Sequence, residues 1–230
     1  MSVLPFTALL VLFLAIPANA QTESEQFWPE IAAYVKINQD TRLYFQVVGN
    51  RENFESTGVN FGASFDYYLK PLIHPKRFVF FQLDESRSRR LLFRAGYHYI
   101  TSTSGSPEQR IVLEASPRFP LKSGVMVVNR NRADLRFIED KFSWRYRNRL
   151  MIEREFAINS YSILPFARIE VYYDSNYEKW STTAISGGCI FPIRKNAELE
   201  LYYEHQNNTG KSPNTQVNAI GLKLDLYFRR

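Results

Sequence analysis

The sequence predicts an all-β fold: a closed antiparallel transmembrane β-barrel of about twelve strands, with ten strands as the alternative number. Apolar and polar residues alternate with period two in segment after segment, as half-buried strands do. Most segments are about ten residues long, the length that a tilted membrane strand needs, and an export signal precedes them. A closed barrel satisfies every backbone hydrogen bond while it exposes apolar side chains to lipid and encloses polar ones.

Residues 1–20 have the features of a secretory signal peptide. An apolar run that ends at Ile16 is followed by a small-residue cleavage site, Ala18-Asn19-Ala20. We expect this segment to be removed, because the run is short for a retained membrane anchor. Residues 21–230 then form one domain, the barrel, in which no run approaches the ~18 apolar residues of a membrane helix.

Eleven segments alternate clearly enough to be predicted as strands. They are residues 29–38, 41–51, 57–70, 91–101, 109–119, 123–132, 142–155, 163–173, 181–193, 196–205 and 216–228. A twelfth strand is predicted at residues 78–83, which are aromatic but alternate poorly. Single-chain bacterial barrels have even strand numbers, and this parity favours twelve strands over eleven.

The last predicted strand shows the alternation most clearly. Every second residue from Ile220 to Phe228 is apolar, whereas the other face carries Lys223 and Asp225. Residues 142–155 repeat the pattern, with the charges on one side only. Because a charge on the lipid face costs a few kcal/mol near the bilayer midplane, the charged faces are predicted to line the lumen.

The connections differ in length near the C-terminus. Residues 121–124 and 192–196 form short connections, whereas residues 131–141 and 205–215 form long polar ones. Short turns face the periplasm and long loops face outside in bacterial barrels. The lengths therefore predict which end of the barrel is external.

The composition limits the classes of partner. The net charge of +6 occurs in a chain with an export signal, which argues against nucleic acid as a partner. Basic rims can instead meet anionic lipid headgroups or acidic solutes, although a solvated excess of arginine is the simpler alternative. The single cysteine, Cys189, excludes an intrachain disulfide. No metal-ligand cluster, phosphate loop or haem motif is present, so neither a metal nor a cofactor is expected.

Arginine recurs at every second position in two successive predicted strands. Arg145, Arg147 and Arg149 share one face of the second strand, and Arg130 and Arg132 share one face of the first. We call these five residues the arginine ladder. Like charges packed this closely repel unless acids neutralise them. The candidate partners are Glu114, Glu153, Glu155, Glu170, Glu198, Glu200 and Glu204.

Two interpretations of the ladder stay open. In one, the protein is a small solute channel whose arginines favour anions. In the other, it is a structural or interaction barrel whose lumen is filled by salt bridges and carries nothing. At twelve strands the lumen is intermediate between a filled small barrel and an open porin. From Asp134 onward, the charges are predicted to continue into an outer loop.

A membrane-embedded hydrolase, phospholipase-like or omptin-like, is the alternative from another class. A phospholipase needs a histidine beside a serine, but no serine on the face of His98 indicates such a partner. Asp174 and His205 could mimic the Asp–His pair of an omptin-like protease. We expect no enzyme activity. An exported soluble barrel is disfavoured, because clustered Arg and Glu make a costly core.

Several runs resemble a known family. They are Phe27-Trp28-Pro29-Glu30, residues 129–137, residues 144–149, Pro165-Phe166 with residues 170–175, and residues 218–228. Together they resemble a family of uncharacterised bacterial outer-membrane barrel proteins, classed as a domain of unknown function, over most of residues 27–228. The resemblance implies the outer membrane of a Gram-negative bacterium, contact with its lipid and insertion by the barrel assembly machinery, but no assigned activity. Arg229-Arg230 extend past Phe228, whereas such chains usually end on the aromatic residue.

Overall fold

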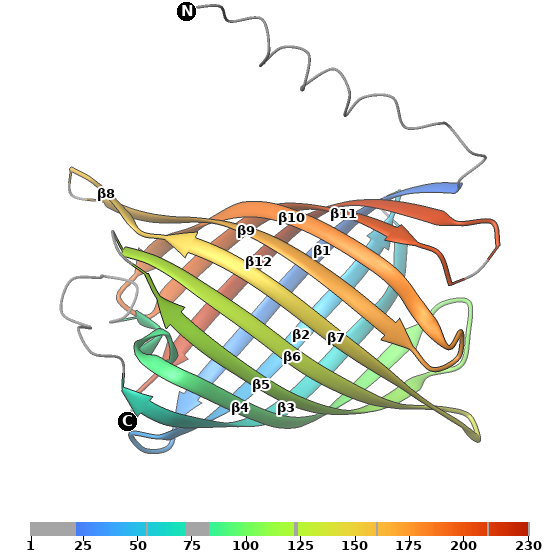
Figure 1. Ribbon diagram of the computed structural model, residues 1–230, viewed down its shortest axis with the longest axis horizontal. Coiled ribbons are helices and arrows are strands. Elements are labelled where there is room, and N and C mark those ends of the chain that lie inside the picture. The colour runs from blue at the N-terminus through green and yellow to red at the C-terminus, as the bar shows by residue number, and fades with distance from the viewer. Residues whose placement is uncertain are drawn as a thin grey trace, which may run out of the picture.

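The computed structural model describes residues 22–53, 55–71, 83–121, 124–159, 161–210 and 212–229, which form a tilted barrel of strands (Figure 1). The strands are β1 (Thr22–Lys36), β2 (Thr41–Glu52), β3 (Glu55–Pro71), β4 (Arg89–Ser102), β5 (Glu108–Pro120), β6 (Val125–Ile138), β7 (Lys141–Arg154), β8 (Phe156–Ile158), β9 (Tyr161–Asp174), β10 (Lys179–Arg194), β11 (Ala197–Asn208) and β12 (Thr215–Phe228). A 3₁₀ turn, η2 (Glu85–Ser88), precedes β4. No helix among these residues is long and apolar enough to cross a membrane.

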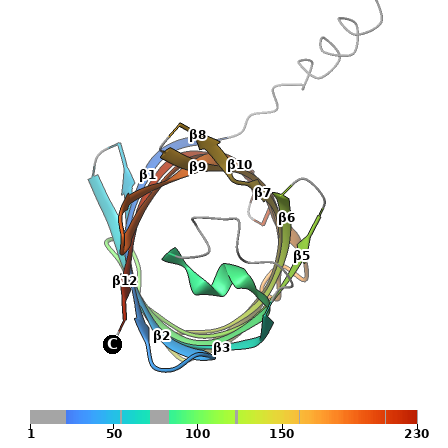
Figure 2. The same cartoon turned by 90° about the vertical axis from the view of Figure 1, so that its left-hand side faces the viewer.

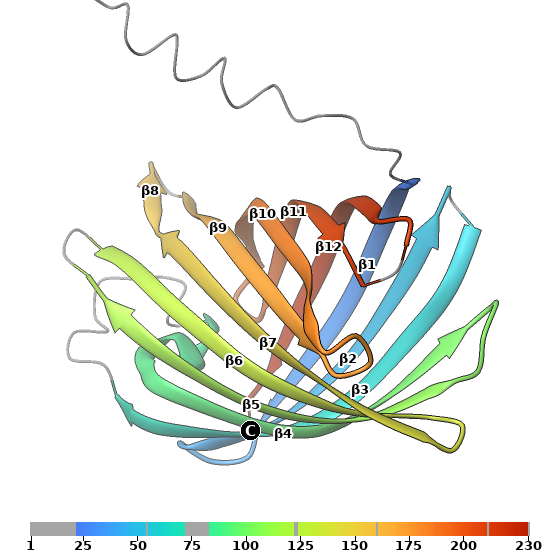
Figure 3. The same ribbon diagram turned by 45° about the vertical axis from the view of Figure 1, so that its right-hand side comes forward.

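Eleven of the twelve described strands close the ring. Neighbouring strands run antiparallel from β1 to β7, then β7 pairs with β9, and β9 to β12 continue the ring. The last pairing, β12 with β1, is parallel, from Thr22 beside Thr215 to Val35 beside Phe228. Figure 3 shows these two strands side by side. An odd number of up-and-down strands requires one parallel pair, so Thr22 and Phe228 lie at opposite ends of the barrel.

The eleven clearly alternating segments of the sequence all correspond to ring strands. The predicted all-β barrel is therefore confirmed, with one parallel pair in an otherwise antiparallel ring. The structure describes twelve strands, the number predicted, but only eleven of them form the ring. The additional strand is β8, a short extension that pairs only with the start of β9. Residues 78–82 of the predicted twelfth strand, and the predicted signal peptide 1–20, lie outside the described residues.

The two faces of the wall have opposite character. In β12, Ile220, Leu222 and Phe228 are 53%, 37% and 48% exposed on the outer face, whereas Asp225 is 4% exposed on the inner face. The core of the protein is thus its own lumen, in which charged and polar side chains are prominent. Asn129, Asn131 and Asn148 form a polar patch on the outer face, where their side chains hydrogen-bond to one another.

The predicted long loop at residues 131–141 is wrong. Strand β6 continues to Ile138, and only the turn residues Glu139 and Asp140 precede β7. The strand continues because Asp134 and Arg136 point into the lumen and form ion pairs there. The longest connection, between β3 and β4, lies at the same end as the short connection of residues 121–124. Loop length therefore does not distinguish the outer end from the periplasmic end.

Candidate functional site

The lumen contains two cavities in series. The larger, of about 340 Å³, lies nearer the Thr22 end, and the smaller, of about 180 Å³, lies nearer the Phe228 end. Seven side chains line both cavities and so form the junction between them. They are Tyr34, Arg94, Arg130, Arg149, Arg168, Glu200 and Lys223. Five of these are cationic, so positive charge surrounds the passage from one cavity to the other.

Cations also predominate around the larger cavity. Its lining includes three carboxylates, Glu30, Glu200 and Glu204. Its cations are Arg94, Arg110, Arg130, Arg132, Arg147, Arg149, Arg168 and Lys223. Other carboxylates, such as Asp66 and Glu170, are buried behind the arginines that they bind. A solute in this cavity would therefore meet guanidinium groups before it met their partners.

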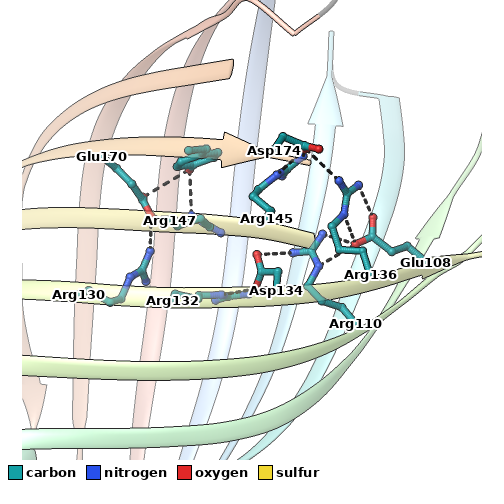
Figure 4. Close-up of polar contacts among 11 residues, drawn as sticks. Glu108, Arg110, Arg130, Arg132, Asp134, Arg136, Arg145, Arg147, Glu170 and Asp174 are labelled. Atoms are coloured by element: carbon teal, nitrogen blue, oxygen red, sulfur yellow. Dashed lines mark hydrogen bonds and ion pairs between the residues drawn. The ribbon is translucent and has the colours of Figure 1, made fainter. Parts of the chain in front are cut away.

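The arginine ladder converges on Glu170. This carboxylate, on β9, is 2% exposed and accepts hydrogen bonds from three ladder arginines, of which Figure 4 shows Arg130 and Arg147. The shortest nitrogen–oxygen distances are 2.7 Å from Arg130, 3.0 Å from Arg147 and 2.7 Å from Arg149. The strand register explains the convergence, because Glu170 pairs with Arg149 across β7–β9 and Arg149 pairs with Arg130 across β6–β7. We call these four residues the Glu170 cluster.

The two other ladder arginines bind aspartates that the sequence analysis did not name as partners. Arg132 Nε lies 2.6 Å from Asp134 Oδ1, and Arg145 Nη2 lies 2.7 Å from Asp174 Oδ2 (Figure 4). Arg136 joins Asp174 to Glu108, at 3.2 and 2.8 Å. The signal for the first pair was present, since Arg132 and Asp134 are two residues apart and share one face of a strand. The second pair required the register between β7 and β9.

Glu153 and Glu200 do not belong to the ladder. Glu153 lies four residues beyond Arg149, about 13 Å along a strand, and lines the smaller cavity instead. The structure therefore does not bring this candidate partner to Arg145, Arg147 and Arg149, because sharing a face does not bring residues to the same depth. Glu200 pairs with Arg168 at 2.5 Å, and both lie at the junction of the cavities.

Aromatic rings hold several lumen arginines in place. The guanidinium of Arg94 lies 3.7 Å from the ring centre of Tyr44, and that of Arg147 lies 4.4 Å from the ring centre of Tyr172. Arg168 stacks on Phe166 at 3.9 Å. Because the ring covers the flat face of the guanidinium, the N–H groups at its edge are directed away from the ring.

Residues 83–88, which we call the lumen segment, cross the Phe228 end of the barrel. Figure 2 looks into this end and shows η2 inside the ring. Asp84 binds Arg42 of β2 at 2.7 Å, the backbone oxygen of Ser86 accepts from Arg118 of β5 at 2.8 Å, and Arg87 binds Glu198 of β11 at 3.0 Å. Contacts to three separated strands fix the segment across the lumen.

The electrostatics of the lumen segment favour its position across the lumen. Burial by itself would raise the pKa of Asp84, but the guanidinium groups of Arg42, Arg87 and Arg118 hold that pKa below its ordinary value. Asp84 is therefore ionised wherever the barrel is folded near neutral pH. The sequence analysis missed the lumen segment, because it shows neither the strand alternation nor a known motif.

The Asp–His pair considered for an omptin-like hydrolase does not form. Asp174 is 1% exposed inside the lumen, where Arg136 and Arg145 bind it. His205 instead shares the outer face with Tyr203, and both hydrogen-bond to Asn218 Oδ1 at 2.8 Å. In the part of the chain that the structure describes, no group of three His, Cys, Asp or Glu residues is suited to hold a metal ion.

A protein-family comparison agrees with this architecture. The family model "Protein of unknown function (DUF2490)" matches residues 25–217, from within β1 to within β12. The chain belongs to the DUF2490 family. The resemblance to an uncharacterised family is thereby confirmed, and the DUF2490 match includes all the lumen residues of the Glu170 cluster.

Comparisons with characterised proteins add little to the DUF2490 assignment. A search of the curated proteins finds no match. A solved structure titled "Bacterial polysaccharide outer membrane secretin" is similar with 9% identity and a TM-score of 0.43, over 79% of this chain and 73% of that chain. This TM-score is too low to transfer a role from that protein to this one.

Proposed function

We propose that this DUF2490 protein is an outer-membrane β-barrel that admits small anionic solutes into an arginine-rich lumen. The observation that carries the proposal is the larger cavity, with eight cationic and three acidic side chains in its lining. Rings of arginine and lysine favour anions in membrane pores. Several counter-carboxylates support the same proposal, because Asp66, Asp134 and Glu170 are buried and are absent from the cavity lining. Glu200, the partner of Arg168, is the exception and lines the cavity.

The outer surface supports a membrane location. Its exposed side chains are largely aliphatic or aromatic, which suits lipid better than water. Near the Thr22 end, Trp144 stacks on Tyr173 at 5.3 Å, and Trp180 meets Tyr173 edge-on at 5.8 Å. Tryptophan and tyrosine gather in this way at membrane–water interfaces. We propose that this surface contacts outer-membrane lipid after insertion by the barrel assembly machinery.

Passage through the barrel requires the lumen segment to move. Its ion pairs with Arg42 and Glu198 close the Phe228 end, so we propose that the barrel as described is the closed state of a channel. The second candidate function is a structural or interaction barrel. The same ion pairs favour it if they never break, because the lumen segment would then stay in place. The two candidates differ in one measurable property, which is conductance.

Planar-bilayer recordings under a KCl gradient test the proposal. We expect the purified mature chain to conduct, with a reversal potential closer to the equilibrium potential of chloride than to that of potassium. Exchange of Arg110 and Arg132 for glutamine should shift that potential toward potassium, because both residues line the larger cavity. Arg136→Gln is the matched control, since Arg136 lies on β6 beyond the cavity lining.

A second variant distinguishes a pore that the lumen segment blocks from a barrel that has no pore. Asp84→Asn with Arg87→Gln removes two of the groups that fix the lumen segment. We expect this variant to conduct more often than the unmodified protein. If neither protein conducts, the channel proposal fails and the structural barrel is supported. A cation-selective current would also contradict the proposal.

A further inference from the structure

We infer that the Glu170 cluster binds the phosphate group of a small solute in the larger cavity, whose lining includes all three arginines of the cluster. The inference rests on the proposed function and names its solute class. Its basis is a charge excess: three guanidinium groups form ion pairs with one carboxylate, so the cluster itself carries two more positive than negative charges, which Glu114 and Glu204 offset only in part from outside the cluster. A dianion is the ligand that neutralises such an excess.

The hydrogen-bond donors of the cluster also exceed its acceptors. Glu170 offers two oxygens, and Oε1 already accepts from both Arg130 and Arg147. Tyr172 accepts one further bond from Arg147 at 2.9 Å. The Nε of Arg130 is buried without a hydrogen-bond partner, although this residue lines both cavities. A buried donor of this kind is costly to leave unpaired, so the cluster is short of acceptors even behind the cavity wall.

The chemistry of the donors favours phosphate over a simple halide. A guanidinium presents two parallel N–H groups that match two oxygens of a phosphate or carboxylate. Arg147 is fixed for this purpose, because its flat face lies on Tyr172. A carboxylate would bring one negative charge, whereas a phosphate monoester brings about two at neutral pH.

The space beside the cluster fits such a solute. The cavity of about 340 Å³ lies within the size range of small-molecule sites. Its polar lining includes Gln46, Asn50 and Gln206, which supply neutral hydrogen-bond donors and acceptors. Both inorganic phosphate and a phosphate monoester of a small polar molecule would therefore be accommodated. The shared chemistry is the phosphate group.

Isothermal titration calorimetry on the full-length mature barrel in detergent tests the inference. The probes are inorganic phosphate, glucose 6-phosphate and sulfate, each titrated at fixed ionic strength. We expect both phosphate probes to bind, and Arg130→Gln to weaken them by about tenfold or more, as loss of a charge-assisted hydrogen bond does. Tighter binding of the ester than of inorganic phosphate would identify an organic phosphate as the solute, and the reverse would identify free phosphate.

Arg136→Gln is the matched control for this experiment. It removes an ion-paired arginine of the same strand and face, but outside both cavity linings, so phosphate affinity should stay within about twofold. Arg130→Lys keeps the charge and loses the paired N–H groups, and we expect an intermediate affinity. Heat-modifiable gel mobility establishes that each variant is folded.

The outcomes separate this inference from the proposed channel. Absence of phosphate binding in a folded, anion-selective barrel would overturn the phosphate site and leave the channel. Sulfate binding as tight as phosphate binding, or equal losses in Arg130→Gln and Arg136→Gln, would also overturn it. Phosphate binding to a barrel that never conducts would support the site and overturn the channel.

Discussion

Arg130 on β6 and Arg149 on β7 lie directly opposite each other across the strand pair, and each lies 2.7 Å from the same carboxylate, that of Glu170. Directly opposed like charges destabilise a strand pair. Here the pair is tolerated because a third strand supplies the acid between them. The stability of this part of the wall therefore depends on a single buried side chain.

The first prediction concerns that side chain. Glu170→Gln removes the only carboxylate within the cluster and leaves Arg130, Arg147 and Arg149 facing one another. We expect the free energy of unfolding to fall by about 3–5 kcal/mol, the usual cost of removing one partner from a buried ion pair. Denaturant unfolding of the barrel in detergent micelles measures it.

Glu178→Gln is the control for this prediction, because Glu178 is exposed in the turn between β9 and β10. Its effect should stay within about 0.5 kcal/mol, as for ordinary surface substitutions. Equal stability of the two variants would mean that Glu170 does not hold the ladder together.

The alternation of side chains was sufficient to predict the wall. Each face of a strand is set by the residue parity, so Leu222 outside and Asp225 inside followed from the sequence. Whether the ring has an odd or an even number of strands could not be predicted in this way. The side-chain pattern of β12 is compatible with either a parallel or an antiparallel pairing with β1, and the structure shows the parallel one. The prediction of an even ring relied on a rule about other barrels rather than on these residues.

The site was predicted only in part, for a related reason. Residue spacing gives position along a strand but not the offset between strands. Glu170 was named correctly as a partner of the ladder. It was not distinguished from Glu153, which lies nearer the Phe228 end of the lumen, at the smaller cavity. Asp174 was considered only for catalysis, although the β7–β9 register places it beside Arg145. The lumen segment had no recognisable pattern at all.

The second prediction tests the assignment of faces. Leu222→Arg places a charge on the outer face at mid-strand, where Leu222 is 37% exposed. We expect assembly into lipid to lose about 2–4 kcal/mol, the cost of arginine near the bilayer midplane. Gln206→Arg is the control, because Gln206 faces the cavity beside Glu204. Heat-modifiable gel mobility of membrane fractions measures assembly, and equal yields of both variants would contradict the assigned faces.

The third prediction uses two adjacent glycines on opposite faces of β10. A Cβ atom on Gly188 would lie 2.3 Å from the backbone oxygen of Leu201, whereas a Cβ atom on Gly187 would come no closer than 3.7 Å to any neighbour. Gly188→Ala should therefore displace the backbone of β11 and cost about 1–3 kcal/mol, as overpacking does. Gly187→Ala should be close to neutral. Urea unfolding of both variants provides the comparison, and a reversed order would show that β11 is not held where we describe it.

The last prediction concerns the pH dependence of the lumen segment. The pKa of Asp84 is lowered in the folded barrel, chiefly by Arg42 against the opposing effect of burial. A carboxylate with a lowered folded pKa contributes stability that is present above its unfolded pKa, about 3.9, and is lost only as the pH falls through the lowered value. The segment should therefore stay in place from pH 8 down to about pH 5.

Thiol labelling measures this directly. Ser88→Cys in a Cys189→Ser background places one reporter thiol at the end of η2. We expect slow labelling by a bulky maleimide between about pH 6 and 8, once the rate is corrected for thiolate content. Asp84→Asn should raise the corrected rate severalfold at every pH in this range, because a neutral amide no longer pairs with Arg42. A corrected rate that rises as the pH falls toward 6, or one unchanged by Asp84→Asn, would show that Asp84 does not hold the lumen segment closed.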